Sequence, residues 1–178
     1  MTGTVEIRNV AGRSRVHARA ARHEMTSSQP PSIQDLKRTL MAAGLEVFRT
    51  RPDAVHLAER PRDNQILDAG ISVRPTVDDA TQSAFEVRVV MRCQRSDFPR
   101  EPAAALFERV RALAVDGLLS RGFEEIETRE HRMPDPGDNE KTLDTWFELV
   151  FSRKVPDVSD AVTEAKLALK LEKYVRAI

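Results

Sequence analysis

The sequence predicts an α+β fold, in which an antiparallel sheet carries its helices on one face. The clearest observation is the alternation of apolar and polar residues over 85–94, which is typical of a strand with one buried face. A turn marked by Pro99 and an amphipathic run from Ala103 to Leu119 follow, and Gly122 comes just after that run. Two more alternating segments and a last helical segment complete the order α-β-β-β-α-β-β-α.

Residues 1–31 differ in composition from the remainder and precede the first predicted helix. They contain five arginines against two glutamates, a net charge of +3, and few large apolar residues. We therefore expect a basic, flexible N-terminal arm that becomes ordered only on a partner. Residues 32–155 form the predicted α+β core domain, and residues 156–178 the predicted C-terminal helical segment.

The first helix is predicted over Ile33–Ala43. Ser32 begins a relaxed capping box that ends at Asp35, and Gly44 stands where a helix C-terminus favours a left-handed residue. A short strand is then predicted at residues 45–48, with 54–58 as a second strand or its continuation. Another strand is predicted at 70–74, and polar and Pro-containing turns separate these segments.

The strand at 85–94 has two distinct faces. Its apolar face is expected in the core: Phe85, Val87, Val89, Met91 and Cys93. Its other face carries Arg88, Arg92 and Gln94, and we interpret it as a contact surface rather than an active site.

After the second helix, the sequence predicts a hairpin from two strands at 123–133 and 144–155. The polar stretch 134–141 between them is expected to be a long tip that is mobile alone and ordered on docking. Residues 123–148 contain nine acidic against three basic residues, a net charge of −6. Trp146 alternates with the apolar residues of its strand, so we expect it either under a helix or exposed at an interface. A last helix is predicted over residues 159–175.

The chain shows no catalytic, metal-binding or cofactor-binding motif, and we expect neither a cofactor nor an enzyme activity. Its four histidines lack metal-ligand spacing, and no glycine-rich phosphate loop is present. Cys93 is expected to be a buried structural thiol, and Asp135 and Asp138 fit turn chemistry better than catalysis. Zero net charge argues against nucleic acid as the main partner. No run of about 18 apolar residues suggests a membrane span, so we expect the chain in the cytoplasm of the cell that makes it.

The element order resembles that of the tail terminator proteins of long-tailed bacteriophages and related phage-tail particles. The matching features lie between Ser32 and Val155: an N-terminal amphipathic helix, a strand region marked by Pro52, the strand that runs into a helix, and a charged hairpin. The resemblance implies a six-membered ring in the virion tail that caps the tail tube and joins it to the head connector. Its partners would be copies of itself, the tail tube protein and a head-completion protein.

In such a ring, Arg88 and Arg92 would pair with carboxylates such as Glu125 or Glu127 of a neighbouring subunit. The interface candidates are Arg88, Arg92, Gln94, Glu125, Glu127, Asp135, Asp138 and Trp146.

Type III secretion chaperones are a rival resemblance, because they share almost the same order and their C-terminal helix fits this chain better. They are dimers that hold a partner polypeptide, and they are usually acidic, whereas this chain is neutral. A third hypothesis is an enzyme with a small-ligand pocket, because curved sheets in α+β folds often hold one.

Overall fold

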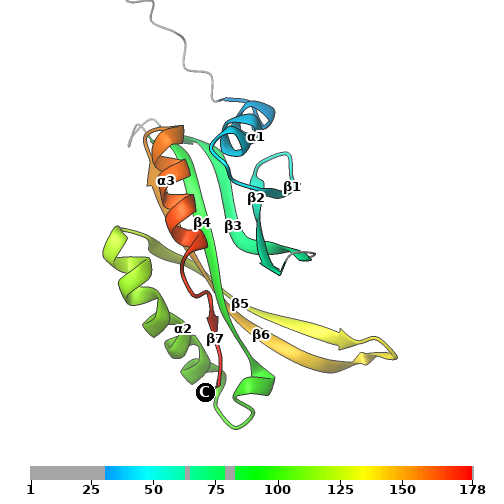
Figure 1. The fold of residues 1–178 in the computed structure, drawn as a ribbon. Helices are drawn as coiled ribbons and strands as arrows, with labels where there is room; N and C mark the ends of the chain where they lie inside the picture. The colour runs from blue at the N-terminus through cyan, green and yellow to red at the C-terminus, as the bar shows by residue number, and fades with distance from the viewer. Residues whose placement is uncertain (1–30, 63–64, 79–82, 178) are drawn as a thin grey trace, which may run out of the picture.

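The computed structural model describes residues 31–62, 65–78 and 83–177, which form three α-helices, two short 3-10 turns and a seven-stranded sheet (Figure 1). The predicted α+β fold is confirmed. Residues 1–30 of the predicted arm lie outside the described part. The elements are α1 (Ile33–Ala42), β1 (Val47–Thr50), β2 (Val55–Arg62), β3 (Gln65–Asp78), β4 (Ser83–Gln94), α2 (Ala103–Gly117), β5 (Glu124–Asp135), β6 (Asp138–Val155), α3 (Val158–Leu169) and β7 (Tyr174–Val175).

The sheet has the strand order β1-β2-β3-β4-β6-β5, and all neighbours along this path are antiparallel. The strand predicted most clearly, β4, lies at its centre. It pairs with β6 in unbroken register from Phe85 opposite Val155 to Gln94 opposite Trp146. The short β7 lies beside the end of β4 and runs parallel to it.

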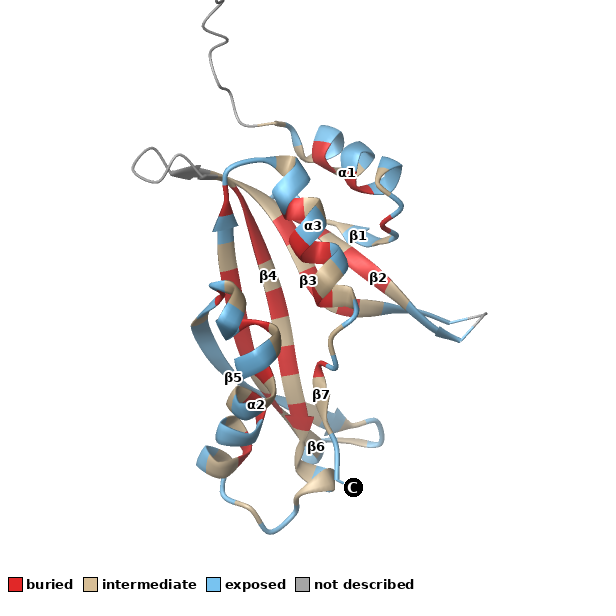
Figure 2. Ribbon diagram, turned by 60° about the vertical axis from the view of Figure 1, so that its left-hand side comes forward, coloured by how far each residue is buried: buried red, intermediate tan, exposed pale blue. Residues whose placement is uncertain are grey.

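All three helices cover one face of the sheet, and the core lies between them and the strands (Figure 2). The alternation in β4 sets this arrangement, since Val87, Val89 and Met91 are at most 1% exposed on the helix side. Phe147 and Phe151 of β6 extend this apolar face, and burial of each large apolar side chain stabilises the fold by about 1.5–3 kcal/mol.

Side-chain caps fix the start of the first and last helices. The Ser32 hydroxyl accepts a hydrogen bond from the Asp35 N–H at 3.2 Å, as the capping box predicts. Asp157 caps α3 in the same way, accepting from the Asp160 N–H at 2.9 Å.

Gly70 marks the point where β3 leaves β4. Its φ of +69° lies in the left-handed region, and an added Cβ would stand 3.1 Å from the Val90 carbonyl oxygen. Before this point β3 pairs only with β2, and β7 pairs with the end of β4, where the Arg92 N–H donates to the Lys173 carbonyl at 2.9 Å. The β2–β3 and β5–β6 hairpins therefore diverge, with the helix-free face of the sheet between them (Figure 1).

Two sequence predictions about the second half are wrong in detail. The expected long loop at 134–141 is a tight hairpin, because the pairing continues to Asp135 opposite Asp138 and leaves a two-residue Pro-Gly turn. The Asp135 carboxylate accepts from the Gly137 N–H at 2.7 Å and closes that turn. The last helix ends at Leu169 rather than residue 175, and the following residues supply β7 instead.

The first three strands are also longer or displaced relative to the prediction. β3 extends well beyond residues 70–74 on both sides, and β1 begins two residues after the predicted start. The described helices are each too short or too polar to cross a bilayer.

Candidate binding face

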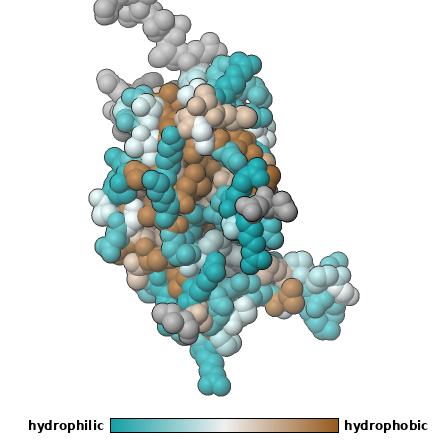
Figure 3. All heavy atoms as spheres, in the orientation of Figure 1, coloured by the Kyte–Doolittle hydropathy of each residue, from teal (hydrophilic) through white to brown (hydrophobic). Residues whose placement is uncertain are grey.

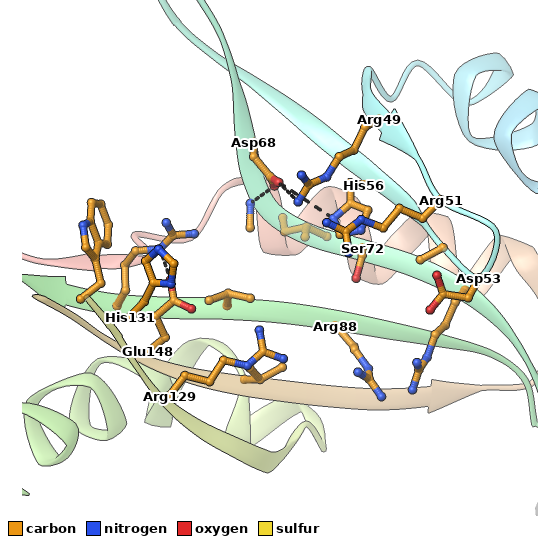
Figure 4. A pocket seen from close by; sticks show the side chains of 18 of the residues that line it. Arg49, Arg51, Asp53, His56, Asp68, Ser72, Arg88, Arg129, His131 and Glu148 are labelled. Atoms are coloured by element: carbon orange, nitrogen blue, oxygen red, sulfur yellow. Dashed lines mark hydrogen bonds and ion pairs between the residues drawn. The ribbon is translucent and has the colours of Figure 1, made fainter. Parts of the chain in front are cut away.

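The face of the sheet opposite the helices holds a cavity of about 590 Å³ lined by residues from β1 to β6. We call it the arginine groove, because six arginines line it: Arg49, Arg51, Arg74, Arg88, Arg92 and Arg129. Two histidines and three carboxylates complete its charged lining: His56, His131, Asp53, Asp68 and Glu148. With both histidines neutral, the lining side chains carry a net charge of +3. Figure 4 shows side chains from both sides of the groove turned toward the same space.

Glu86 of β4 anchors two of these arginines. Its carboxylate is buried, 6% exposed, and accepts hydrogen bonds from Arg74 Nε at 2.5 Å and Arg88 Nε at 2.9 Å. The hydroxyl of Ser152 on β6 donates to the same carboxylate. Because each bond engages Nε, which is one of five N–H donors of a guanidinium, both arginines keep capacity for a ligand. Glu86 beneath them reduces the local net charge from +3 to +2.

Arg92 occupies one end of the groove between two aromatic rings. Its guanidinium carbon lies 4.8 Å from the centre of the Trp146 ring and 5.2 Å from that of Tyr174, distances typical of cation–π contacts. Its Nε stands 3.7 Å from the Glu148 carboxylate and is buried with no hydrogen-bond acceptor in the described part of the chain. The position of Arg92 is therefore set by stacking and charge, and one of its donors remains unused.

The opposite side of the groove comes from β1, β2 and β3. Asp68 accepts from the Gly70 N–H at 2.9 Å and pairs with Arg49 at 3.2 Å, beside His56 (Figure 4). Burial lowers the pKa of His56; the nearby Asp68 opposes this shift, and Arg49 and Arg51 add to it. His56 is therefore neutral at pH 7, and arginines supply the positive charge of the groove.

The structure brings some predicted interface residues together and separates others. Arg88, Arg92 and Trp146 all line the groove, whereas Gln94, the strand partner of Trp146, is not among its lining residues. Trp146 is half-buried and lies on the face of the sheet opposite the three helices, so they do not cover it.

Glu125 and Glu127 already have partners within the chain. Glu125 accepts from Arg111 of α2 at 2.6 Å, and Glu127 from Arg129 at 2.5 Å. These hydrogen bonds lower the pKa of both carboxyls, so both are ionised at neutral pH.

Sequence reasoning missed the contribution of the first three strands to the groove. Arg49, Arg51 and Asp68 stand near predicted turns or outside predicted strands, and nothing local links them to β4. The one available signal was His56, which alternates with apolar neighbours in its strand.

The second notable surface is the β5–β6 hairpin, which projects from the body as an arm with a mostly hydrophilic surface (Figure 3). β5 is an edge strand, and its residues 126–132 are all exposed. We call residues 134–144 the hairpin tip; it contains four acidic residues and one lysine, a net charge of −3. Asp135 and Asp138 lie at its turn, and Leu143 is 63% exposed.

Asp144 attaches the base of the tip to the body. Its carboxylate accepts from the Ser96 N–H at 3.1 Å, in the short turn that follows β4. Burial alone would raise the pKa of Asp144, but hydrogen bonds from Ser96 and Thr145 outweigh it and lower that pKa. The hydrogen bond from Ser96 connects the base of the tip to the turn after β4.

The arginine-rich lining of the groove matches the chemistry of anion recognition. Arginines bind carboxylates and phosphates through paired, charge-assisted hydrogen bonds. Within the described ranges, no three His, Cys, Asp or Glu side chains gather as a metal site would require. Cys93 lies on the other face, 2% exposed, and burial raises its pKa to about 11, so it is the structural thiol that the sequence predicts.

Searches against models of protein families, curated proteins and solved structures found no match for this chain.

Proposed function

We propose that this chain is a structural assembly protein: a tail terminator-like subunit of a six-membered ring that caps a phage tail tube and joins it to the head connector. The observation that carries the proposal is the β5–β6 hairpin. It extends beyond the body into solvent, and a solvent-exposed two-stranded ribbon gains little stability for its own domain. Such an arm is typical of a segment that packs on another chain.

The charge distribution supports assembly through two different surfaces of the chain. The acidic hairpin tip and the basic arginine groove are different surfaces of the same molecule. Contacts between two different surfaces are head-to-tail, and such contacts close into rings when the rotation between subunits allows it. A two-fold dimer would use the same contact only where each tip enters the groove of the other copy at the same time.

A second candidate function is a chaperone-like dimer that binds a partner polypeptide. The observation in its favour is α3, which packs against β3 and β4 and buries Ala161, Ala165 and Ala168 in the core. Secretion chaperones share this order of helices and strands, including a helix at the C-terminal end. In that case the partner would lie across the sheet, and the chain would associate as a pair.

Native mass spectrometry of the chain, with and without a purified tail tube protein, distinguishes the two functions by the number of copies in the assembly. The ring proposal expects hexamers, whereas a stable dimer that does not change with concentration would overturn it in favour of the chaperone. A stable monomer in all conditions would overturn both.

A variant tests whether the hairpin carries assembly. Residues 134–143 are replaced by Asn-Gly, which joins Met133 to Asp144 at a position where they already pair. We expect a folded monomer with a circular dichroism spectrum and melting temperature close to those of the parent chain. Hexamers of this variant would contradict the role of the hairpin.

A further inference from the structure

We propose that the acidic hairpin tip of one copy binds in the arginine groove of the neighbouring copy. This inference rests on the proposed self-assembly and specifies its interface. It also replaces the expectation that Glu125 or Glu127 supplies the carboxylates, because each of those already pairs with an arginine of its own chain.

The charges of the two surfaces are complementary. The tip carries a net charge of −3, and the groove lining carries +3, or +1 when Glu86 and Glu127, which pair with lining arginines, are included. Complementary charges steer association and fix which surfaces meet, and they disfavour contacts between like surfaces. Groove-to-groove and tip-to-tip pairing are both disfavoured here.

The tip carries carboxylates that are available to a partner. Asp135 and Asp138 each accept one backbone N–H through a single oxygen, and Asp138 also contacts Lys141 at 3.0 Å. Glu140 is exposed on the strand that leaves the turn. A carboxylate accepts several hydrogen bonds, so Asp135 and Glu140 retain capacity for arginine donors.

The groove offers donors of matching kind. Arg51 is exposed, in the turn between β1 and β2. Arg88 lies near the centre, held by Glu86 through one nitrogen. The groove volume of about 590 Å³ lies in the range of sites that hold a small ligand, roughly 300–1,000 Å³, and therefore suits a turn with a few side chains rather than a whole domain.

A chain's tip does not reach its own groove. His131, Met133 and Trp146 line the groove, and the hairpin continues from there away from the body to the turn between Asp135 and Asp138 (Figure 1). Met133 is the lining residue nearest the turn, and two residues of strand place Asp135 roughly 7 Å beyond it, at about 3.3 Å per residue. The contact between tip and groove therefore joins two molecules.

Charge reversal tests the contact through sedimentation velocity of the full chain in low salt. Arg51→Glu and Glu140→Lys each change an exposed side chain, so we expect folded proteins whose self-association is weakened about tenfold or more. Arg100→Glu is the matched control, because Arg100 is exposed outside the groove, and it should associate like the parent chain. A 1:1 mixture of Arg51→Glu and Glu140→Lys should regain association, because the reversed tip of one variant then meets the reversed groove of the other.

The outcomes separate this inference from the function it rests on. A hexamer that tolerates Arg51→Glu and Glu140→Lys as well as it tolerates Arg100→Glu would overturn the tip-to-groove contact and leave the ring intact. A parent chain that stays monomeric overturns the ring, and the contact with it. Thermal stabilisation by inorganic phosphate that Arg51→Glu abolishes, without any change in assembly, would identify the groove as a small-anion site and overturn the proposal.

Discussion

Glu86→Gln is the sharpest test of how the arginine groove is built. The substitution keeps the shape of a buried side chain but removes the charge that holds Arg74 and Arg88 through their Nε atoms. The amide also places an N–H₂ group among donors, where Ser152 and the two arginines require an acceptor. We expect lower stability together with a less ordered groove.

The expected loss of stability follows from the burial of the three groups. A hydrogen bond to a charged group contributes about 1.5–3 kcal/mol, and the substitution affects three such bonds, two from arginines and one from Ser152. The side chains of Arg74 and Arg88 are 29% and 26% exposed, so water restores part of their solvation. A net loss of about 2 kcal/mol remains, which corresponds to a fall in melting temperature of roughly 4–8 °C for a chain of this size.

Urea unfolding measured by the fluorescence of Trp146, the single tryptophan, provides the assay. With a slope of about 2 kcal/mol per molar urea, the midpoint should fall by about 1 M. Glu127→Gln is the matched control, because its pair with Arg129 is 45% and 44% exposed and should contribute at most about 0.5 kcal/mol. Equal midpoints for the two variants would refute the reasoning that Glu86 anchors the groove.

Three further predictions concern Gly70, Cys93 and His56. Gly70→Ala should lower the free energy of unfolding by about 2 kcal/mol, and by more than Gly44→Ala does. Both glycines have a positive φ, but only at Gly70 would the added Cβ stand 3.1 Å from a carbonyl oxygen. Equal losses for the two variants in urea unfolding would contradict this close approach. Cys93, with a pKa of about 11, should have roughly one thiolate in a thousand at pH 8, so iodoacetamide should label it only as urea unfolds the chain, and labelling at the rate of a free thiol would refute its burial. Because the pKa of His56 is lowered below 6.5 in the folded state, the unfolded chain binds more protons at acid pH, and stability should fall as pH drops below about 6.5. His56→Asn should flatten this fall in thermal melts between pH 7.5 and 5, whereas an unchanged slope would assign it to other groups.

Local patterns were sufficient for much of the fold. Alternation in 85–94 predicts which side chains of β4 are buried, because successive residues of a strand point to opposite faces. Amphipathic spacing located the three helices, and the capping box at Ser32 marked the start of the first, since both signals depend on residues close together in the sequence. The polar face of β4 was recognised as a contact surface in the same way, and that interpretation stays a prediction.

The hairpin tip and the end of the last helix show where local reading fails. Residues 134–141 have the composition of a loop, but cross-strand pairing continues through them to a two-residue turn. Residues 174–175 continue a helical pattern in the sequence. They form a strand instead, because β3 leaves β4 at Gly70 and the free edge of β4 pairs with them. In both cases the competing partner lies far away in the sequence.

The sequence by itself determined the α+β class, the buried face of the central strand and the acidic character of the hairpin, because each depends on neighbours along the chain. Only the tertiary structure decided that Arg49 and Arg51 share a groove with Arg88 and Arg129. That grouping depends on strand order, on register and on the bend at Gly70. The residues next to a charged side chain in the sequence do not indicate which side chain it will face on another strand, because cross-strand register brings the two together.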